Sequence, residues 1–476
     1  MKVVVVGGGS AGWITASYIK NSIECELTVI HEEQNNPIGV GETVTPTLRL
    51  IAENANIQEN VWLRDSDATF KYGIKFNDWN HQGSVWYHLF EDAFEFSETK
   101  LDSVEYCINN FDMSTKYFNL FHGPQQYLLD RNLTPYPKTI SDRPGHAYQI
   151  LADKFGATLK KHLNDYTLIA SSVKDVGINE NGIEFLKLNN GQTVYGDVFF
   201  DCSGFNRILI SKFSEYESYD DMICNKFVAG KVRGVPERHK IYTELTAKPD
   251  GWMWDVNTRN RTASGFIYSE HFTTDDEARK ILKDAWNGQI DFVFDCLKFE
   301  NGSMKSVAVD NCISNGLAQS FIEPMEATSL MLTCVTVINF VDQYKKKKKW
   351  TSKESKVLSR HLKRFLKHSK EFVKYHYTLS DRTDSEFWRY WNNQQNIEEY
   401  NDYLNMFLSK KRYCKKGETI FNHFNLASML IGYDKPYLNR TKNVEADWEK
   451  PDYATEYSTN ITHDNFLNMV HDGRIH

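Results

Sequence analysis

The sequence lacks any apolar run of about 18 residues or more, the length that a membrane-spanning helix requires. Its most apolar stretch, residues 330–341, is interrupted by Thr333, Thr336 and Asn339. An apolar run follows Lys2 at the N-terminus, but it is shorter than a signal peptide and ends in glycines. We therefore predict a cytoplasmic protein with no membrane partner.

The sequence also lacks an excess of basic residues and any paired cysteine motif. Its 476 residues include 56 Lys and Arg against 63 Asp and Glu, which gives a formal net charge of −7. Proteins that bind nucleic acid normally carry excess positive charge, so we expect no nucleic-acid partner. The 8 cysteines show no CxxC pair or zinc-finger spacing, which indicates reduced structural thiols and no metal site.

Glycines gather directly after the first apolar run. Residues 2–6 are typical of a β-strand, residues 7–12 match G-x-G-x-x-G, and residues 13–21 follow in a helical pattern. In this order the loop lets a pyrophosphate approach a helix N-terminus, where N–H groups favour anions. A glycine loop without a ligand is the alternative. The pattern indicates a dinucleotide site with the candidate residues Gly7, Gly9, Ser10, Ala11 and Gly12.

Two later segments support this dinucleotide site. An acidic residue about 20 positions after the loop should bind the ribose. Glu32 is the candidate, although His31 occupies the first position where the acid would be sought. A strand at residues 197–200 runs into Asp201-Cys202-Ser203-Gly204, which favours FAD over NAD because FAD is wrapped by more of the chain. Asp201 and Gly204 are therefore further candidates, and the cofactor class indicates redox chemistry.

The second half of the sequence is typical of helices. Apolar residues repeat at helical spacing over 326–344, with Pro324 just before them. Thr351-x-x-Glu354 is a capping-box pattern, and further helical spacing follows it. No long Pro/Gly/Ser linker separates these parts. We predict a cofactor-binding module over residues 1–345 and a helical module over residues 346–476 that packs on it.

Seven segments, taken in order, resemble the flavin-dependent tryptophan halogenase family. They are residues 7–13, 39–43, 70–76, 87–90, 201–204, 251–254 and 321–328. The resemblance implies an α/β fold, with a Rossmann-like FAD module of the glutathione-reductase and aromatic-hydroxylase type and an added helical substrate module. It also implies that a separate NAD(P)H-dependent flavin reductase supplies FADH2, that O2 and halide then yield hypohalous acid, and that an aromatic substrate receives the halogen. Gly39, Val40, Gly41 and Glu42 become further cofactor-binding candidates.

A lysine would make the halogenation selective, because free hypohalous acid is a promiscuous oxidant. An ammonium can polarise the acid, a neutral amine can accept the halogen, and burial lowers the pKa of a lysine. Lys71 matches the family's catalytic lysine and has the apolar neighbours Phe70, Ile74 and Phe76. A surface lysine is the alternative. Lys75, four residues on, would share its face of one strand, so only the register of the family motif favours Lys71.

A carboxylate beside the substrate would stabilise the positive charge that builds on the ring and accept the proton that leaves. Glu326 matches the family's glutamate, and a glutamate that complements a helix dipole is the alternative. Thr328 and Ser329 begin the same helix, where N–H groups would hold a halide. The family usually has glycine at the position of Ser329.

Four aromatic positions also match the family. Trp252 and Trp254 correspond to paired tryptophans that keep the substrate away from the flavin, but the chain continues Asp255-Val256-Asn257 instead of a lysine or similar residue and Ile-Pro. His88 and Phe90 correspond to residues that sandwich the aromatic substrate. Trp252 and Trp254 are two positions apart, as are His88 and Phe90. Core packing on one face of a strand would produce the same spacing.

The substrate is not specified by the sequence. Gly417, Glu418 and Thr419 stand where the family's aromatic lid is expected, so an indole or phenol is favoured over free tryptophan. A basic run from Lys345 to Lys349, with further Lys and Arg to residue 370, is typical of a solvated face, and docking of an acidic partner is the alternative. The competing functions are a flavin-dependent aromatic hydroxylase and a non-catalytic flavin-binding protein. A homo-oligomer is compatible with the sequence.

Overall fold

The computed structural model describes residues 1–32, 41–95, 102–110, 114–136, 143–234, 236, 238–293, 295–394, 420–435 and 451–474, with the side chains of 108–110 excepted. The chain forms two compact units. The first combines residues 1–68, 150–223 and 299–367, and the second combines residues 69–149, 224–298 and 368–476. Residue 345, where the composition indicated a module boundary, lies inside the third stretch of the first unit. Each unit is therefore assembled from separated stretches, which composition along the chain does not reveal.

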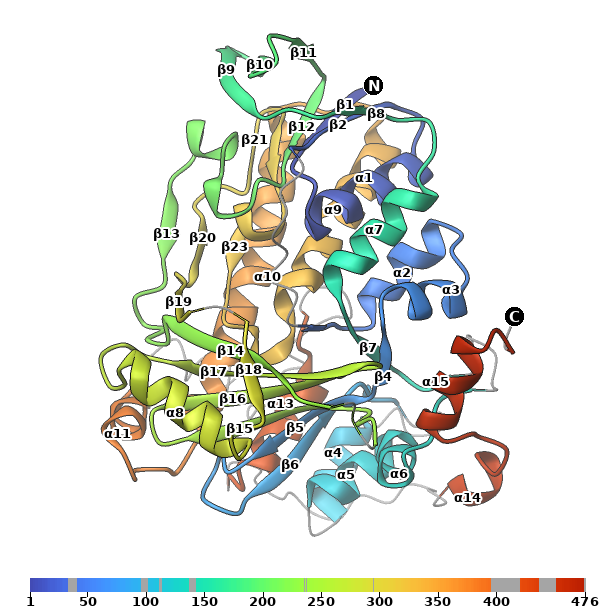
Figure 1. Cartoon of the computed structure of the whole chain (residues 1–476), viewed down its shortest axis with the longest axis vertical. Coiled ribbons are helices and arrows are strands. Elements are labelled where there is room, and N and C mark those ends of the chain that lie inside the picture. The colour runs from blue at the N-terminus through green and yellow to red at the C-terminus, as the bar shows by residue number, and fades with distance from the viewer. Residues whose placement is uncertain are drawn as a thin grey trace. The chain divides into compact units, whose positions relative to one another are not determined.

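A mostly parallel sheet is the centre of the first unit (Figure 1). Its strands, in spatial order, are β21 (Ala308–Val309), β22 (Cys312–Ser314), β12 (Val198–Asp201), β1 (Lys2–Val6), β2 (Glu26–Ile30) and β8 (Thr167–Ile169). Only the β21–β22 pair is antiparallel. The valines of β1 are all buried, as expected for a parallel strand covered on both faces. Because β1 and β12 run parallel, their carboxyl ends meet at one edge of the sheet.

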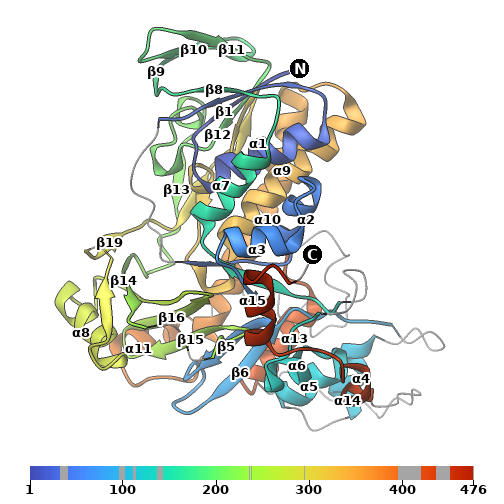
Figure 2. The same cartoon turned by 45° about the vertical axis from the view of Figure 1, so that its right-hand side comes forward.

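Helices pack beside this sheet. They are α1 (Ser10–Ser22), α2 (Thr47–Asn54), α3 (Glu59–Asp65), α7 (Ala152–His162) and α9 (Thr328–Lys347). Both α7 and α9 pack against α1, as Figures 1 and 2 show. The helix predicted over 326–344 is thus confirmed as α9, and its first turn lies in the same unit as the glycine loop.

Smaller elements complete the first unit. They are β3 (Glu42–Thr43), β9 (Val173–Asn179), β10 (Gly182–Leu188), β11 (Thr193–Tyr195), β13 (Tyr216–Ser218), β20 (Gly302–Met304), β23 (Ser320–Phe321) and the 3₁₀ helices η2 (Gly204–Asn206), η3 (Ile210–Lys212), η4 (Gly316–Ala318) and η5 (Pro324–Glu326). Strands β9, β10 and β11 form one antiparallel sheet, and β13, β20 and β23 form another.

An eight-stranded sheet is the centre of the second unit. In spatial order its strands are β18 (Ile290–Phe292), β14 (Lys226–Val232), β17 (Arg261–Tyr268), β16 (Gly251–Thr258), β15 (Thr243–Lys248), β5 (Gly73–Asn77) and β6 (Val85–Leu89), with β19 (Leu297–Lys298) also paired to β14. All pairs are antiparallel except β15 with β5. A short pair beside it joins β4 (Thr69–Lys71) to β7 (Ala147–Ile150).

The helices assigned to the second unit come from three stretches of chain. They are α4 (Ser103–Asn110), α5 (Thr115–His122), α6 (Gln125–Arg131), α8 (Asp275–Ala285), α11 (Glu386–Asn393), α13 (His423–Gly432), α14 (Tyr453–Glu456) and α15 (His463–His471). A further helix, α10 (Ser352–Thr378), belongs to the first unit up to Lys367. It begins directly after Thr351, whose hydroxyl donates to the Glu354 carboxylate and accepts from the N–H of Lys353. The pattern therefore stands at the start of the helix, with a side-chain contact in place of the reciprocal backbone bonds of a capping box. Within the described ranges, no helix combines the length and apolarity needed to cross a bilayer.

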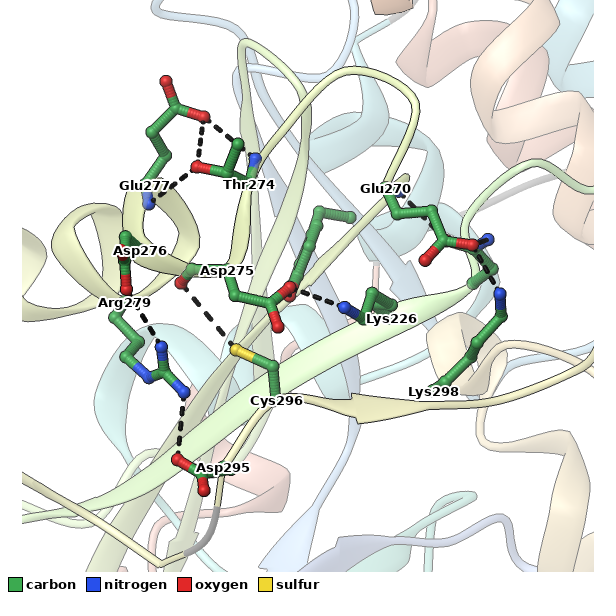
Figure 3. Close-up of polar contacts among 12 residues, drawn as sticks. Lys226, Glu270, Thr274, Asp275, Asp276, Glu277, Arg279, Asp295, Cys296 and Lys298 are labelled. Atoms are coloured by element: carbon green, nitrogen blue, oxygen red, sulfur yellow. Dashed lines mark hydrogen bonds and ion pairs between the residues drawn. The ribbon is translucent and has the colours of Figure 1, made fainter.

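Polar contacts fix α8 on the sheet of the second unit (Figure 3). Thr274 and Glu277 form a capping box at its first turn. Lys226 on β14 lies 2.6 Å from Asp275. Arg279 contacts Asp295, which precedes β19, at 2.9 Å. The three acidic residues of the first turn also complement the helix dipole, so this cluster stabilises the helix.

Candidate active site

The glycine loop connects the carboxyl end of β1 to the N-terminus of α1. Gly7 has a φ of +118°, and a Cβ there would lie 2.2 Å from the carbonyl oxygen of Cys202. A Cβ on Gly12 would lie 1.9 Å from the carbonyl oxygen of Gly7. By contrast, a Cβ on Gly9 would have no heavy atom of the described chain within 4 Å. Packing therefore requires the first and third glycines, and the second leaves the space through which a pyrophosphate would approach.

The N-terminus of α1 is open to an anion. Gly9 is its N-cap, no side chain in the described ranges caps it, and its first turn contains no acidic residue. Its first N–H groups therefore remain for a ligand, which fits the pyrophosphate of FAD. The His31 ring fills the space beside Gly8, and the exposed Glu32 follows it. Glu32 thus stays the candidate for the ribose.

The Asp201 carboxylate orders the loop that follows β12. It accepts hydrogen bonds from the N–H and hydroxyl of Ser203 at 3.1 and 2.6 Å. It also accepts from the N–H groups of Leu209 and Ile210 at 2.7 and 2.8 Å. Because both oxygens are engaged, Asp201 shapes the loop, and the neighbouring Gly204 has open space around its α carbon. The turn at Gly204 therefore stays the candidate for a second approach of backbone to a ligand, and Asp201 supports the turn.

Asn315 was missed by the sequence analysis. It is fully buried, and its side-chain amide donates to the Thr15 hydroxyl at 2.9 Å and to the Thr333 carbonyl at 3.1 Å. Its own N–H donates to the Asp201 carbonyl at 2.9 Å. Asn315 therefore ties α1, β12 and α9 together. The only sequence signal is the dipeptide Asn315-Gly316, a turn pattern that says nothing about such distant partners.

The predicted glutamate and halide residues surround the start of α9 in the first unit. Glu326 ends η5 and is buried, with 4% of its surface exposed. Ala327 is the N-cap with a φ of +56°, and it provides no capping hydroxyl. The Thr328 hydroxyl is buried and has no hydrogen-bond partner in the part of the chain that the structure describes. A helix N-terminus with an unpaired hydroxyl and no acid in its first turn can hold an anion.

Lys71 belongs to the second unit, where it ends β4. Its side chain is fully buried, as its apolar neighbours predicted, and its Nζ lies 5.2 Å from the centroid of the Phe90 ring. An ammonium at this distance is attracted by the face of an aromatic ring. The arrangement brings together two of the predicted site residues, one at the end of β4 and one just after the end of β6.

Lys75 differs from Lys71 in its strand, face and partner. The expectation that both lysines share one face of one strand is wrong, because β4 ends at Lys71 and β5 begins at Gly73. In the strand register of β5, Ile74 stands opposite His88 of β6, whereas Lys75 stands opposite Glu244 of β15. Its Nζ lies 2.9 Å from the Glu244 carboxylate. Burial alone would raise the pKa of Glu244, but the charges of Lys240 and Lys75 outweigh it and lower this pKa to about 2. Lys75 is therefore part of a structural ion pair.

His88, Trp252 and Trp254 lie on the sheet face opposite Lys75, as the strand registers show. His88 is buried beside the stacked rings of Phe372 and Phe421, and Asn425 lies 3.0 Å from its Nε2. Trp254 faces Gly265, where a Cβ would lie 2.5 Å from the indole. Phe90 follows the end of β6 at Leu89. The registers therefore place three of the four predicted substrate residues, His88, Trp252 and Trp254, on one sheet face, and Phe90 lies just beyond the end of β6.

Some of the remaining predicted residues lie in the described part of the chain, and the others lie outside it. Gly41 is buried, and Glu42 begins β3 in the first unit. Ser10 and Ala11 open α1, and Ser329 is half-buried in the first turn of α9. Gly39, Val40, Gly417, Glu418 and Thr419 lie outside the described residues.

Comparison with known proteins identifies the family of the chain. The sequence model of the tryptophan halogenase family matches residues 2–444, so the chain belongs to the tryptophan halogenase family. It is a flavin-dependent halogenase, an oxidoreductase. The predicted α/β fold with a Rossmann-like FAD module is confirmed by the solved halogenase structures that share it.

The chain is similar to halogenases from several bacteria. The tryptophan 6-halogenase of Streptomyces albogriseolus is 28% identical over 420 residues, which cover 81% of this chain and 78% of that protein. The tryptophan 7-halogenase of Lentzea aerocolonigenes is 25% identical over 414 residues, which cover 82% and 78%. A solved flavin-dependent halogenase from Xanthomonas campestris has a TM-score of 0.86 at 20% identity and covers 98% of both chains.

Proposed function

We propose that the chain uses FADH2, O2 and a halide to halogenate an electron-rich arene of the indole or phenol class by electrophilic substitution, with Lys71 directing the halogen. Reduced FAD, when bound, would give two electrons to O2 and bring it to the oxidation level of a peroxide, which oxidises halide to hypohalous acid. A separate NAD(P)H-dependent reductase would provide the FADH2. The observation that carries the proposal is the complete burial of Lys71 with its Nζ 5.2 Å from the Phe90 ring.

Flavin binding would use the open positions of the first unit. The N–H groups at the start of α1 would hold the pyrophosphate beside Gly9, where a Cβ would meet no neighbour. Glu32 would accept from a ribose hydroxyl, and the turn at Gly204 would approach the cofactor a second time. The open space at Gly9 and Gly204 and the uncapped start of α1 therefore support the assignment of FAD to the first unit.

Lys71 would capture hypohalous acid through a charge-assisted hydrogen bond. An ammonium in water is surrounded by solvent, but the buried Nζ of Lys71 faces the Phe90 ring and is screened from bulk water. The same environment would exclude water from the polarised halogen. Lys75 does not offer these conditions, because its side chain is partly exposed to solvent.

The other candidate residues would orient and complete the reaction. His88 and Phe90 would bind the arene, and Trp252 and Trp254 would keep it from the flavin. Glu326 would take the proton that the ring loses, since a buried carboxylate is a suitable base. The Thr328 hydroxyl, together with N–H groups of Thr328 and Ser329, would hold the halide.

Product analysis tests the proposal directly. The purified chain would be incubated with a flavin reductase, NADH, FAD, and chloride, bromide or iodide, with indoles, phenols and free tryptophan as substrates. Mass spectrometry should detect a halogenated indole or phenol only when a halide is present. Several relatives are named as tryptophan halogenases, so free tryptophan tests whether this chain shares their substrate. A hydroxylated product that forms regardless of halide would contradict the proposal and favour an aromatic hydroxylase.

A further inference from the structure

Oxidisable aromatic side chains form a continuous series through the second unit. The Trp252 ring lies 6.2 Å from that of Trp79, which lies 5.6 Å from Tyr377. Tyr377 stacks on Trp391 at 4.5 Å, and Trp391 lies 5.5 Å from Tyr390. These distances join ring centroids. We call these five residues the aromatic relay, and each ring contacts the next.

The elements that carry the relay are separate in the sequence but adjacent in the unit. Trp252 comes from β16, Trp79 follows β5, Tyr377 ends α10, and Trp391 and Tyr390 lie on α11. Trp388 on α11 adds a parallel connection, 5.8 Å from Trp79 and 6.1 Å from Tyr377. Trp252, Trp79 and Trp391 are fully buried, whereas Tyr390 is partly exposed. The relay therefore leads from the face of the predicted substrate residues to the surface.

The buried indoles of the relay are suited to transfer a one-electron oxidation from one ring to the next. The N–H groups of Trp79 and Trp391 are buried and have no hydrogen-bond partner within the described ranges. A tryptophan that loses an electron there has no acceptor for its proton, so it remains a cation that its neighbour can reduce. Trp86, outside the relay, has an unpaired N–H of the same kind, so what distinguishes the relay is the series of contacts between oxidisable rings.

We propose that the aromatic relay protects the halogenase by carrying oxidising equivalents away from the substrate side when no arene is bound. This inference rests on the proposed function, since hypohalous acid and its side reactions are the source of the oxidant. Hypohalous acid reacts with a halide ion and a proton to give dihalogen and water, and one electron from free reduced flavin converts the dihalogen into a dihalide radical anion. This radical anion is the oxidant: it takes one electron from Trp252 and becomes two halide ions.

The electron is replaced from the surface. Trp79 gives an electron to Trp252 and regains one from Trp391 by tunnelling through the Tyr377 ring, which keeps its proton and is not itself oxidised. Tyr390 finally loses one electron to Trp391 and its phenolic proton to water. An external thiol then returns a hydrogen atom to the Tyr390 radical and becomes a thiyl radical. Oxidant reduction and tyrosine oxidation thus balance, and Trp252 is restored without a covalent change.

Trp86 provides a matched control for the relay. It is fully buried in the same unit, and its indole N–H also lacks a described partner. Its ring contacts Phe76 at 4.4 Å, His376 at 5.8 Å, His88 and Tyr433, none of which is a relay residue. Trp86→Phe therefore reproduces the change in size and polarity outside the relay.

Turnover in the presence and absence of arene tests the relay. Trp79→Phe, Trp391→Phe and Trp86→Phe would be compared with the parent chain, using reductase, NADH, FAD and bromide. We expect similar initial bromination rates for all four with arene. Without arene, the two relay variants should lose activity after several-fold fewer NADH oxidations, and peptide mass spectrometry should find oxygen or bromine added at Trp252. Equal lifetimes and equal Trp252 modification in Trp79→Phe and Trp86→Phe would overturn the proposal.

A second measurement separates this inference from the proposed function. If the parent chain makes no brominated arene, the proposed function fails. The relay can still be oxidised by dibromide radical anions, which radiolysis of a bromide buffer produces. Electron paramagnetic resonance should then detect a tyrosyl radical in the parent and in Trp86→Phe. The signal should be lost in Tyr390→Phe, a change at a partly exposed site that preserves packing. A signal of equal size in Tyr390→Phe would overturn the relay by itself.

Discussion

The backbone N–H of Phe70 donates a hydrogen bond to Nε2 of His463 at 3.0 Å, although the two residues are 393 positions apart. His463 begins α15 and is fully buried. Because Nε2 accepts, the ring proton is on Nδ1, which lies 3.3 Å from the carbonyl oxygen of His239. A neutral histidine near the C-terminus therefore fixes the strand residue that precedes Lys71.

Replacing His463 should disturb the position of Lys71. In His463→Ala the buried Phe70 N–H loses its acceptor, so we expect the free energy of unfolding to fall by about 1–3 kcal/mol. The kcat for halogenation should fall more than KM changes, because β4 is no longer held in place. His463→Gln, which offers an amide oxygen, should restore part of both losses. Urea unfolding and steady-state kinetics measure them, and an unchanged kcat in His463→Ala would show that Lys71 does not depend on this contact.

Stability should decrease on mild acidification because of buried histidines. Burial lowers the pKa of His463 from 6.5 to about 3, and burial likewise lowers that of His122 to about 4. Both are neutral when folded, whereas the unfolded chain binds protons as the pH falls below 6.5. The unfolded state thus holds more protons in this window, and each group reduces the free energy of unfolding by about 1.4 kcal/mol per pH unit.

The comparison of variants isolates this effect from other groups. Burial raises the pKa of Asp255 from 3.8 to about 6, which gives the opposite slope within that range. The difference between His463→Gln and the parent, measured by urea unfolding at about pH 7 and about pH 5, is therefore the decisive quantity. The variant should lose less stability than the parent. His81→Gln, at an exposed turn, should follow the parent, and equal losses in all three proteins would contradict the prediction.

The two neighbouring lysines should respond differently to substitution. Lys71→Ala should reduce kcat/KM for halogenation by about 10²–10⁴-fold, the range for loss of a positioned proton-donating group. Lys75→Ala should retain the parent rate, because Lys75 lies on the other sheet face and pairs with Glu244. It should instead lower stability slightly, since Glu244 keeps its contact with Lys240. Product formation under initial-rate conditions checks both, and equal losses in the two variants would refute a specific role for Lys71.

Local patterns predicted the parts of the site that depend on neighbouring residues. The glycine loop, the turn after β12 and the start of α10 follow from backbone geometry and capping within a few positions, and the structure has them where the sequence indicated. The break between β4 and β5 was not predictable, because Lys71 pairs with Ala147 whereas Ile74 pairs with His88 and Thr243. Strand ends at such a place are decided by distant partners. The same applies to Asn315 and His463, whose contacts join segments that are remote in the sequence.

The glycines of the cofactor loop should differ in their sensitivity to alanine. Gly9→Ala introduces no steric contact, so we expect a normal melting temperature and FAD binding weakened by about tenfold, equivalent to about 1.4 kcal/mol. Gly12→Ala would place its Cβ 1.9 Å from the Gly7 carbonyl oxygen, which should destabilise the fold even without FAD. Fluorescence titration with FAD and thermal unfolding distinguish the two effects. Unchanged FAD affinity in Gly9→Ala would show that the open space is not used by the pyrophosphate.

The Thr328 hydroxyl should serve the halide and contribute nothing to folding. It is buried, and the described chain offers it no hydrogen-bond partner, so Thr328→Val removes an unpaired polar group while it preserves the shape of the side chain. We expect the free energy of unfolding to stay equal or to rise by about 1 kcal/mol. The KM for bromide should increase several-fold, whereas the KM for the arene should not change. A fall in stability with an unchanged KM for bromide would mean that the hydroxyl has a structural partner and that the halide binds elsewhere.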